Sequence, residues 1–198
     1  MTSEQRVQIR TLSVGPMDNN VYLLVCPTTA ESVLVDAADE ADRILKEAEG
    51  TTVRCILQTH GHRDHVQALR AVKDALGVPL GVHEGDAAML PVPPDFFLRD
   101  GDRIPFGNQE LLVIHTPGHT PGGVCFLVDG YLISGDTLFP GGPGNTATAL
   151  GDFPLIIESI RRKLFTLPDD TVVLPGHGRG TTIGAEKPHL EEWIARGW

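Results

Sequence analysis

The stretch His60-Gly61-His62-Arg63-Asp64-His65 decides how the rest of this chain is interpreted. Three of the eight histidines of the chain lie in these six residues, with a carboxylate between the second and the third. The apolar run Val53–Leu57 leads into the stretch, and a helical pattern of apolar residues follows it and ends at Gly77. The histidines are therefore expected in the turn between a buried strand and a helix, where several side chains can point toward one place.

The residue types in this stretch are those of a metal site. Neutral imidazole nitrogens and a carboxylate suit zinc, and they also suit iron or manganese. The alternative is a polar loop that merely contains several histidines. The remainder of the chain argues against that alternative.

Three later segments repeat the arrangement of a strand followed by a glycine-rich turn. The predicted strands are Leu111–Ile114, Tyr131–Ile133 and Thr171–Leu174, and the turns after them are His115–Gly122, Ser134–Thr137 and Pro175–Gly178. In each turn a glycine or proline beside a polar residue lets the backbone come close to another group. One histidine in such a turn is usually only a hydrogen-bonded turn residue. Four strand ends that each present a metal-ligating residue type favour a metal site.

Length and composition are those of an ordinary globular protein. With 198 residues the chain can bury a substantial core, and we expect residues 1–198 to form a single domain. Hydrophobic residues make up 41% and charged residues 21% of the sequence. The formal net charge of −10 and the lack of a Lys/Arg cluster argue against a nucleic-acid partner.

The sequence predicts a cytoplasmic protein with no membrane partner. No apolar stretch approaches the roughly 20 residues of a membrane span, and the N-terminal stretch Met1–Arg6 lacks the apolar core of a signal peptide. Cys26, Cys55 and Cys125 are odd in number, lie in apolar strand-like runs and lack the paired spacing of a thiolate metal site. We interpret them as reduced core residues, as expected in the cytoplasm.

The remaining patterns predict two rounds of strands followed by helices. Besides the strands given above, strands are expected around Val7–Leu12 and at Val21–Cys26, Ser32–Asp36, Pro79–Val82 and Val124–Val128. Helices are expected from a cap at Asp39 to Gly50, and at Glu84–Leu90, Pro154–Leu167 and Lys187–Arg196. Asp129-Gly130 predicts a hairpin, and Pro91–Pro94 a surface loop.

The order of the polar residues resembles that of the metallo-β-lactamase superfamily. The resemblance extends from Asn20 to the closing helix and rests on His60-x-His62-x-Asp64-His65, followed by His119, Asp136 and His177. It implies an α+β fold, a four-layer αββα sandwich with the site at the edge where the strand ends meet. It also implies the ligands: His60, His62 and His119 for one metal, Asp64, His65 and His177 for the second, and Asp136 as the bridge.

The resemblance implies a hydrolase with two divalent metal ions. We expect zinc, although iron and manganese are compatible with the same residues. In two-metal sites the cations lie about 3.5–4 Å apart, and a bound water can ionise near neutral pH. A metal-bridging hydroxide would attack the substrate carbonyl while one metal polarises it. Asp64 is the expected catalytic residue because it could orient this hydroxide. Ser134 has no base as a partner and is interpreted as structural.

Within the superfamily the chain resembles the glyoxalase II-like, or hydroxyacylglutathione hydrolase-like, group. The likeness rests on Thr116–Gly122 and Gly135–Phe139. Members of that group act on thioesters of small thiols, and a thiolate leaves without a strong general acid. The expected substrate is therefore a small-molecule S-acyl thioester of a low-molecular-weight thiol.

Two features set the sequence apart from glyoxalase II itself. That enzyme has a further C-terminal helical region that helps to bind glutathione, whereas this sequence ends at Trp198, just after the closing helix. The family also tends to have an arginine soon after the bridging aspartate, and Asn145 stands at that place here. We therefore expect a carrier other than glutathione, such as mycothiol or bacillithiol. The loop Phe139–Asp152 is expected to form the rim that selects the substrate.

A mononuclear iron persulfide dioxygenase is the alternative. That branch resembles glyoxalase II but ligates one iron through the equivalents of His60, His119 and Asp136, a ligand set typical of non-haem iron oxygenases. The same residue types serve both branches, so the metal content separates them better than the sequence does. A non-enzymatic metal-binding module is a third interpretation, which the intact ligand set disfavours.

Three histidines remain without a predicted role. His83 and His115 also end strands, so they could donate to ligand carboxylates or carbonyls, or they could be ordinary turn residues. His189 lies at the start of the last helix, where it is expected to pack or to cap, with lining of the pocket as the alternative.

Overall fold

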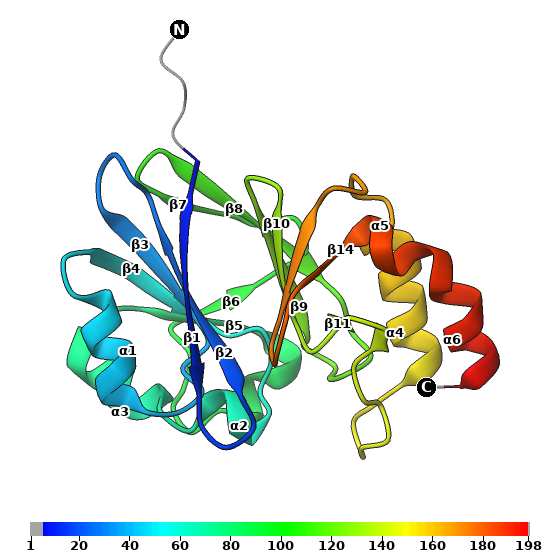
Figure 1. Ribbon diagram of the computed structural model, residues 1–198. Coiled ribbons are helices and arrows are strands. Elements are labelled where there is room, and N and C mark those ends of the chain that lie inside the picture. The colour runs from blue at the N-terminus through cyan, green and yellow to red at the C-terminus, as the bar shows by residue number, and fades with distance from the viewer. Residues whose placement is uncertain (1–5, 198) are drawn as a thin grey trace, which may run out of the picture.

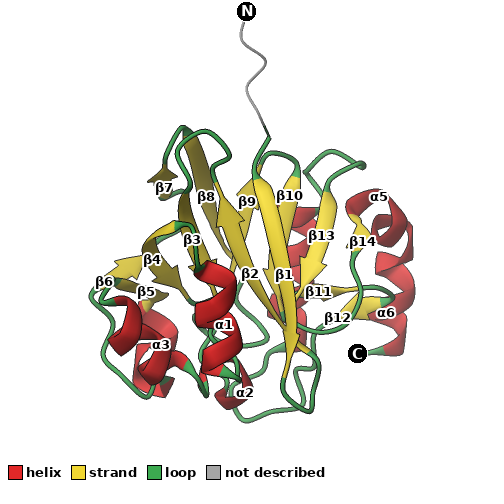
Figure 2. Cartoon of the chain, turned by 60° about the vertical axis from the view of Figure 1, so that its left-hand side comes forward, coloured by secondary structure: helices red, strands yellow, loops and turns green. Residues whose placement is uncertain are grey.

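Two six-stranded sheets pack face to face with helices outside them in the computed structural model, which describes residues 6–197. Residues 1–5 of the N-terminal stretch and Trp198 lie outside the described residues. Figure 1 shows α1 and α3 on one side of the paired sheets and α4 and α6 on the other, and Figure 2 shows the strands between the two sets of helices. The predicted four-layer αββα sandwich is confirmed.

The first sheet has the strand order β1-β2-β3-β4-β5-β6. Its strands are β1 (Gln8–Val14), β2 (Asn19–Val25), β3 (Glu31–Val35), β4 (Thr52–Leu57), β5 (Leu80–His83) and β6 (Phe96–Leu98). The pairs from β1 to β3 are antiparallel, and those from β3 to β6 are parallel. The helical segments of this half are α1 (Ala41–Ala48), α2 (Arg63–Val66), α3 (Leu69–Leu76) and the 3₁₀ helix η1 (Glu84–Met89).

The second sheet has the order β14-β13-β10-β9-β8-β7, and a two-stranded ribbon β11-β12 is separate from it. Its strands are β7 (Arg103–Phe106), β8 (Gln109–His115), β9 (Val124–Val128), β10 (Tyr131–Gly135), β13 (Val172–Pro175) and β14 (Thr181–Thr182). The ribbon consists of β11 (Leu138–Phe139) and β12 (Gly142–Pro143). The helical segments are α4 (Phe153–Ser159), the π-helical turn η2 (Ile160–Leu164), α5 (Ile183–Glu186), η3 (Lys187–His189) and α6 (Leu190–Arg196).

Strand β2 shows how the sequence builds the layers. All seven of its residues are buried, because helices cover one face of the first sheet and the second sheet covers the other. Leu23 belongs to the hydrophobic cluster beneath α1 and α3, whereas Leu24 belongs to the cluster between the sheets. A third cluster, around Ile160 and Trp193, lies beneath the C-terminal helices. A continuous apolar run such as Val21–Val25 is the pattern expected of a strand buried on both faces.

Some predicted boundaries are wrong, and local contacts explain the differences. The helix after the histidine stretch is divided into α2 and α3, because the N–H groups of Gln67 and Ala68 bond to carbonyls of the loop after β3 instead of continuing one helix. Asp39 does not cap α1. The cap residue is Glu40, in a left-handed conformation (φ 52°), and the Asp39 carboxylate accepts from the N–H of Glu40 instead of from the first turn of α1. Gly77 ends α3 in the left-handed conformation (φ 65°), as predicted.

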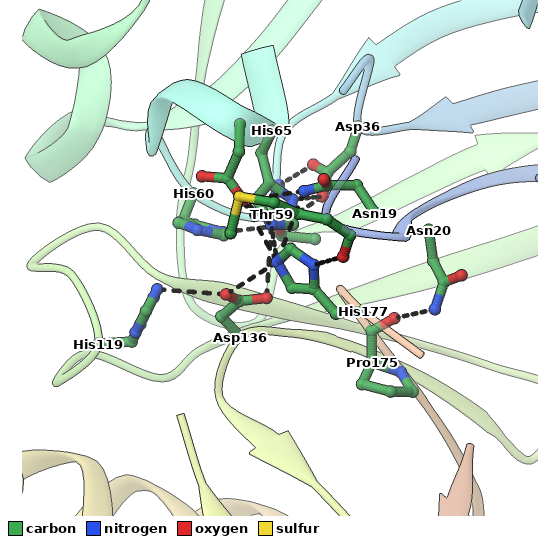
Figure 3. Close-up of polar contacts among 12 residues, drawn as sticks. Asn19, Asn20, Asp36, Thr59, His60, His65, His119, Asp136, Pro175 and His177 are labelled. Atoms are coloured by element: carbon green, nitrogen blue, oxygen red, sulfur yellow. Dashed lines mark hydrogen bonds and ion pairs between the residues drawn. The ribbon is translucent and has the colours of Figure 1, made fainter. Parts of the chain in front are cut away.

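The fold brings the ends of β3, β4, β8, β10 and β13 to one edge of the sandwich, where the polar turns predicted from the sequence meet (Figure 3). Among the described residues, no helix has the length and apolar character needed to cross a membrane.

Candidate metal centre

All the side chains predicted as ligands converge on one place. They come from the turn between β4 and α2, from α2 itself, and from the turns after β8, β10 and β13: His60, His62, Asp64, His65, His119, Asp136 and His177. Figure 3 shows His60, His65, His119 and His177 arranged around Asp136. Their convergence is thus confirmed, while their role as ligands stays a prediction.

The side chains form two adjacent clusters. In the first cluster, the nearest ligating atoms of His60, His62 and His119 all lie within 4.8 Å of one another. In the second cluster, those of Asp64, His65 and His177 meet the same limit. Each cluster offers three ligands for one cation.

Asp136 lies between the two clusters. Its Oδ1 is 3.4 Å from Nε2 of His65, and its Oδ2 is 3.5 Å from Nε2 of both His119 and His177. His119 belongs to the first cluster and His177 to the second, so one carboxylate reaches both. This is the position expected of a bridging ligand.

Four of the imidazole rings are oriented by hydrogen bonds from their Nδ1 atoms. The acceptors are Oγ1 of Thr59 for His60 (3.0 Å), Oδ2 of Asp36 for His65 (2.9 Å), the Asn145 carbonyl for His119 (2.7 Å) and the Met17 carbonyl for His177 (2.9 Å). In a neutral ring that donates through Nδ1, Nε2 carries no proton. The four Nε2 atoms therefore face the centre and are electron-pair donors whenever their rings are neutral.

Several buried atoms of the centre lack a protein partner, which fits a metal site. Nε2 of His60, Nε2 of His119 and Oδ1 of Asp136 are buried and accept no hydrogen bond from the described residues. Nε2 of His65 and Nε2 of His177 lie 3.2 Å apart, too close for a proton on each. Buried polar atoms are rarely left unpaired in native proteins. A divalent cation in each cluster would satisfy these atoms.

The electrostatics of the centre also favour bound positive charge. Burial lowers the pKa of His65, but the neighbouring carboxylates of Asp136 and Asp36 outweigh it, so that the pKa is raised. Hydrogen bonds to Asp136 and Asp64 raise the pKa of His177. In turn, the hydrogen bond from His177 holds the pKa of Asp64 well below its ordinary range. The carboxylates are therefore ionised and attract a cation, whether a proton or a metal.

In the first cluster, the pKa values of two histidines are lowered, so these rings are neutral. Burial, together with the nearby ring of His65, lowers the pKa of His60 well below its ordinary value. Burial and the ring of His119 likewise lower the pKa of His62. Neutral imidazoles are the form that binds metals, so these rings need to lose no proton before ligation.

Comparison with protein families agrees with this geometry. The model of the metallo-beta-lactamase superfamily matches residues 14–177, which include every residue of the two clusters. The chain belongs to the metallo-beta-lactamase superfamily. Within this metallo-hydrolase superfamily, it is 33% identical over 186 residues to hydroxyacylglutathione hydrolase GloC of Haemophilus influenzae, an alignment that covers 83% of this chain and 88% of that protein.

Solved structures with the same fold resemble this superfamily member over nearly its whole length. BLEG-1, a B3 metallo-beta-lactamase, has a TM-score of 0.86 and 31% identity, with 92% of this chain and 97% of that chain covered. ETHE1 from Myxococcus xanthus has a TM-score of 0.84 and 30% identity, with 95% and 88% covered. The superfamily fold and the His/Asp clusters together indicate divalent metal binding.

Asp36 contacts the metal centre of this superfamily member, and the sequence reasoning missed it. It follows β3 with φ 61°, a strained conformation for a residue with a side chain. Its carboxylate accepts from the N–H and the hydroxyl of Thr59 (both 2.8 Å) and from His65. The signal was available, because Asp36 directly follows a buried strand, as the predicted ligands do.

Asn19 is the second missed residue. Its Nδ2 lies 2.9 Å from Oδ2 of Asp64, to which it donates, and 3.5 Å from Nε2 of His177. It therefore contacts two of the three side chains of the second cluster. No local pattern marked it, because both contacts come from distant parts of the chain.

Hydrogen bonds from side chains of β2 fix the turn that carries His177. The Pro175 carbonyl accepts from the Tyr22 hydroxyl (2.6 Å) and from Nδ2 of Asn20 (3.0 Å), as Figure 3 shows for Asn20. Gly176 has no space for a side chain, because a Cβ there would overlap Oδ1 of Asp136 and come within 2.7 Å of the His65 ring. The glycine of this turn is therefore a requirement of the metal centre.

The other histidines do not belong to either cluster. The rings of His83 and His115 stack with centroids 3.9 Å apart and an interplanar angle of 10°. His115 donates from Nε2 to the Pro121 carbonyl at 3.0 Å, so it supports the loop that carries His119. His189 contacts the carboxylate of Glu192 on α6, away from the clusters.

Proposed function

We propose that this protein hydrolyses S-acyl thioesters of a low-molecular-weight thiol, as a glyoxalase II-like metal-dependent enzyme. The observation that carries the proposal is the pair of three-ligand clusters with one carboxylate between them. The similarity to a hydroxyacylglutathione hydrolase supports a thioester as the substrate. We also propose a single domain and a cytoplasmic location, with which the three buried free cysteines are compatible.

The proposal assigns each cluster one metal ion, with Asp136 as a ligand to both. Zinc is the proposed metal because imidazole and carboxylate ligands suit it, although iron and manganese accept the same donors. When bound, two such ions would supply an ionised water as the nucleophile and would polarise the thioester carbonyl.

Asp64 is the proposed catalytic residue. Its side chain is 25% exposed, so it faces the solvent from which water and substrate arrive, whereas His65 is fully buried. Asn19 and His177 contact its Oδ2 at 2.9 Å and 3.3 Å and fix its position. Because its pKa is held well below the ordinary range, Asp64 would orient the attacking water as a hydrogen-bond acceptor rather than store a proton. The thiolate product needs no protonation to leave.

The rim of the centre supports a carrier other than glutathione. The Asn145 carbonyl holds the His119 ring, and Oδ1 of Asn145 accepts from the N–H of Ala147, so this side chain turns back onto its own loop. It offers no positive charge at the place where the family tends to have an arginine. Mycothiol and bacillithiol thioesters are therefore our first choices.

The test is thiol release by the purified, metal-loaded protein from a panel of thioesters. Glutathione, mycothiol, bacillithiol and coenzyme A would each carry formyl, acetyl and lactoyl groups. We expect release from one carrier well above the others, and its loss in the Asp64→Ala and His65→Ala variants. Release that persists in both variants, or no release from any thioester, would contradict the proposal.

A mononuclear iron persulfide dioxygenase is the second candidate. The resemblance to ETHE1 gives this alternative some weight. It would use His60, His119 and Asp136, and the last two lie 3.5 Å apart. One iron per chain, together with oxygen consumption on addition of a glutathione persulfide and no thioester hydrolysis, would favour it over our first proposal.

A further inference from the structure

Asp86 is a buried carboxylate that lies outside both metal clusters. It belongs to η1 and has 0% relative exposure, and no basic side chain of the described residues forms an ion pair with it. Placing a carboxylate in such an environment is costly unless hydrogen bonds compensate for lost solvation. Its contacts therefore indicate what it does.

Three donors surround Asp86, and they come from two loops. Its Oδ2 accepts from the N–H of Gly61 at 2.8 Å and from the hydroxyl of Thr120 at 2.7 Å. Its Oδ1 accepts from the N–H of Gly122 at 2.7 Å. One carboxylate thus joins segments that are about sixty residues apart in the sequence and that follow strands of different sheets, β4 and β8.

These two loops carry the whole first cluster. Gly61 stands between His60 and His62, and Thr120 directly follows His119. The position of His119 relative to the two other rings therefore depends on Asp86. A further hydrogen bond close by connects the same parts of the chain, from the N–H of Val124 to the Thr59 carbonyl.

The backbone of η1 packs closely against both loops around Asp86. A Cβ at Gly122 would lie 2.6 Å from the backbone nitrogen of Asp86, and a Cβ at Gly61 would lie 2.7 Å from Cβ of Met89. On the other side, a Cβ at Gly85 would lie 2.9 Å from the nitrogen of Gly122. The backbones of η1 and of the loop after β8 are thus in direct contact, and the Asp86 carboxylate fixes the distance between the two loops that it joins.

The second cluster is held by other groups. Asp36 bonds His65, Asn19 bonds Asp64, and the Met17 carbonyl accepts from His177. None of these hydrogen bonds involves Asp86. A change at Asp86 therefore acts on one cluster and leaves the supports of the other intact.

We propose that Asp86 is a positioning residue that sets the metal affinity of the first cluster alone. The inference rests on the proposed function, since it requires that His60, His62 and His119 hold one of two metal ions. Asp86 keeps His119 at ligating distance from the other two rings through the three hydrogen bonds to their loops.

The Asp86→Asn variant tests this inference, because all three partners donate and an amide NH₂ would face at least one of them. Zinc binding by the full chain would be titrated against a chromophoric chelator. Ring ¹⁵N shifts of the assigned histidines would show which cluster fills. We expect wild type to bind two zinc ions, and the variant to bind the first-cluster ion roughly 10–100-fold more weakly with the second unchanged.

Two further variants keep the test decisive. Asp95→Asn is the matched control, because Asp95 accepts from the backbone N–H of Leu80 at 2.7 Å but bonds neither cluster loop, so both affinities should stay as in wild type. Thr120→Val removes only one of the three hydrogen bonds and should weaken the first cluster by a smaller factor. It decides the question if Asp86→Asn does not fold.

The inference and the proposed function fail in different ways. Wild type that binds no metal in these clusters would remove the proposed function. Wild type with two zinc ions, together with Asp86→Asn and Thr120→Val variants that bind both ions equally well or lose both equally, would overturn the inference alone.

Discussion

Oδ2 of Asp36 lies 2.9 Å from Nδ1 of His65, and the same oxygen accepts from the Thr59 hydroxyl at 2.8 Å. Since Thr59 accepts in turn from Nδ1 of His60 at 3.0 Å, one buried carboxylate orients a ring of each metal cluster. Carboxylates behind metal-ligating histidines fix the tautomer and raise the basicity of the ring. Asp36 thus supports both clusters, whereas Asp86 supports the first.

We expect Asp36→Asn to weaken both metal positions, each by about 10–100-fold, because both rings lose their anionic support. The measurement is the same competition titration with zinc. Asp95→Asn is a suitable control, since Asp95 also accepts from a backbone N–H, that of Leu80, but has no contact with the clusters. Wild-type affinity at both positions in Asp36→Asn would contradict the role given to this residue.

The convergence of the proposed ligands could be predicted from the sequence, because each of them stands in a recognisable local pattern. His119, Asp136 and His177 all follow an apolar strand within a turn that contains glycine, and such a turn can be recognised without its partners. Asp36 stands in the same kind of pattern and could have been found. The short strands β6, β7 and β14 have no such pattern, since their pairing with neighbours defines them.

Asp86 and Asn19 could not be predicted, for a physical reason. Their roles depend on hydrogen bonds to residues at least 25 positions away in the sequence, and these exist only after the sheets have packed. The surrounding sequence of Asp86 predicts only a short helix, which η1 confirms. A buried support is visible only in three dimensions.

Metal binding is expected to release a proton from the second cluster. Neighbouring carboxylates raise the pKa of both His65 and His177 to about 10. Because their Nε2 atoms lie 3.2 Å apart, too close for a proton on each, the metal-free pair shares one proton at neutral pH. Ligation requires both Nε2 atoms to be unprotonated, so about one proton should leave for each chain loaded. Calorimetric zinc titrations in buffers of different ionisation enthalpy would measure it, and zero release would refute the shared proton.

The same raised pKa predicts how the stability of the metal-free protein depends on pH. A histidine whose pKa rises on folding contributes fully below its unfolded value of about 6.5, and the contribution is lost as the pH rises through the folded value. With that value near 10, the Tm of chelator-treated protein should fall as the pH is raised from neutral to about 10. The His65→Gln variant should show a flatter Tm profile in thermal melts. An equal slope in both proteins would count against the assignment.

Gly176→Ala is expected to abolish metal binding while the protein still folds. The added Cβ would press on Oδ1 of Asp136, which lies between the two clusters, and on the His65 ring, which belongs to the second cluster. Metal content after dialysis and thermal melting would be measured together. Gly130→Ala serves as the control: Gly130 has φ 82° with open space around its Cβ position, so the variant should cost about 1 kcal/mol of stability and keep its metal. Two bound metals in Gly176→Ala would show that the turn can move aside.

Tyr22→Phe is expected to separate stability from metal affinity. The variant loses the 2.6 Å hydrogen bond to the Pro175 carbonyl, which Asn20 still satisfies, so the free energy of unfolding should fall by only about 0.5–1.5 kcal/mol. Because this hydrogen bond holds the turn that carries His177, the second metal position should weaken while the first keeps its affinity. Denaturant unfolding and the zinc competition titration would measure the two effects. An unchanged second position would mean that Asn20 alone suffices to hold this turn.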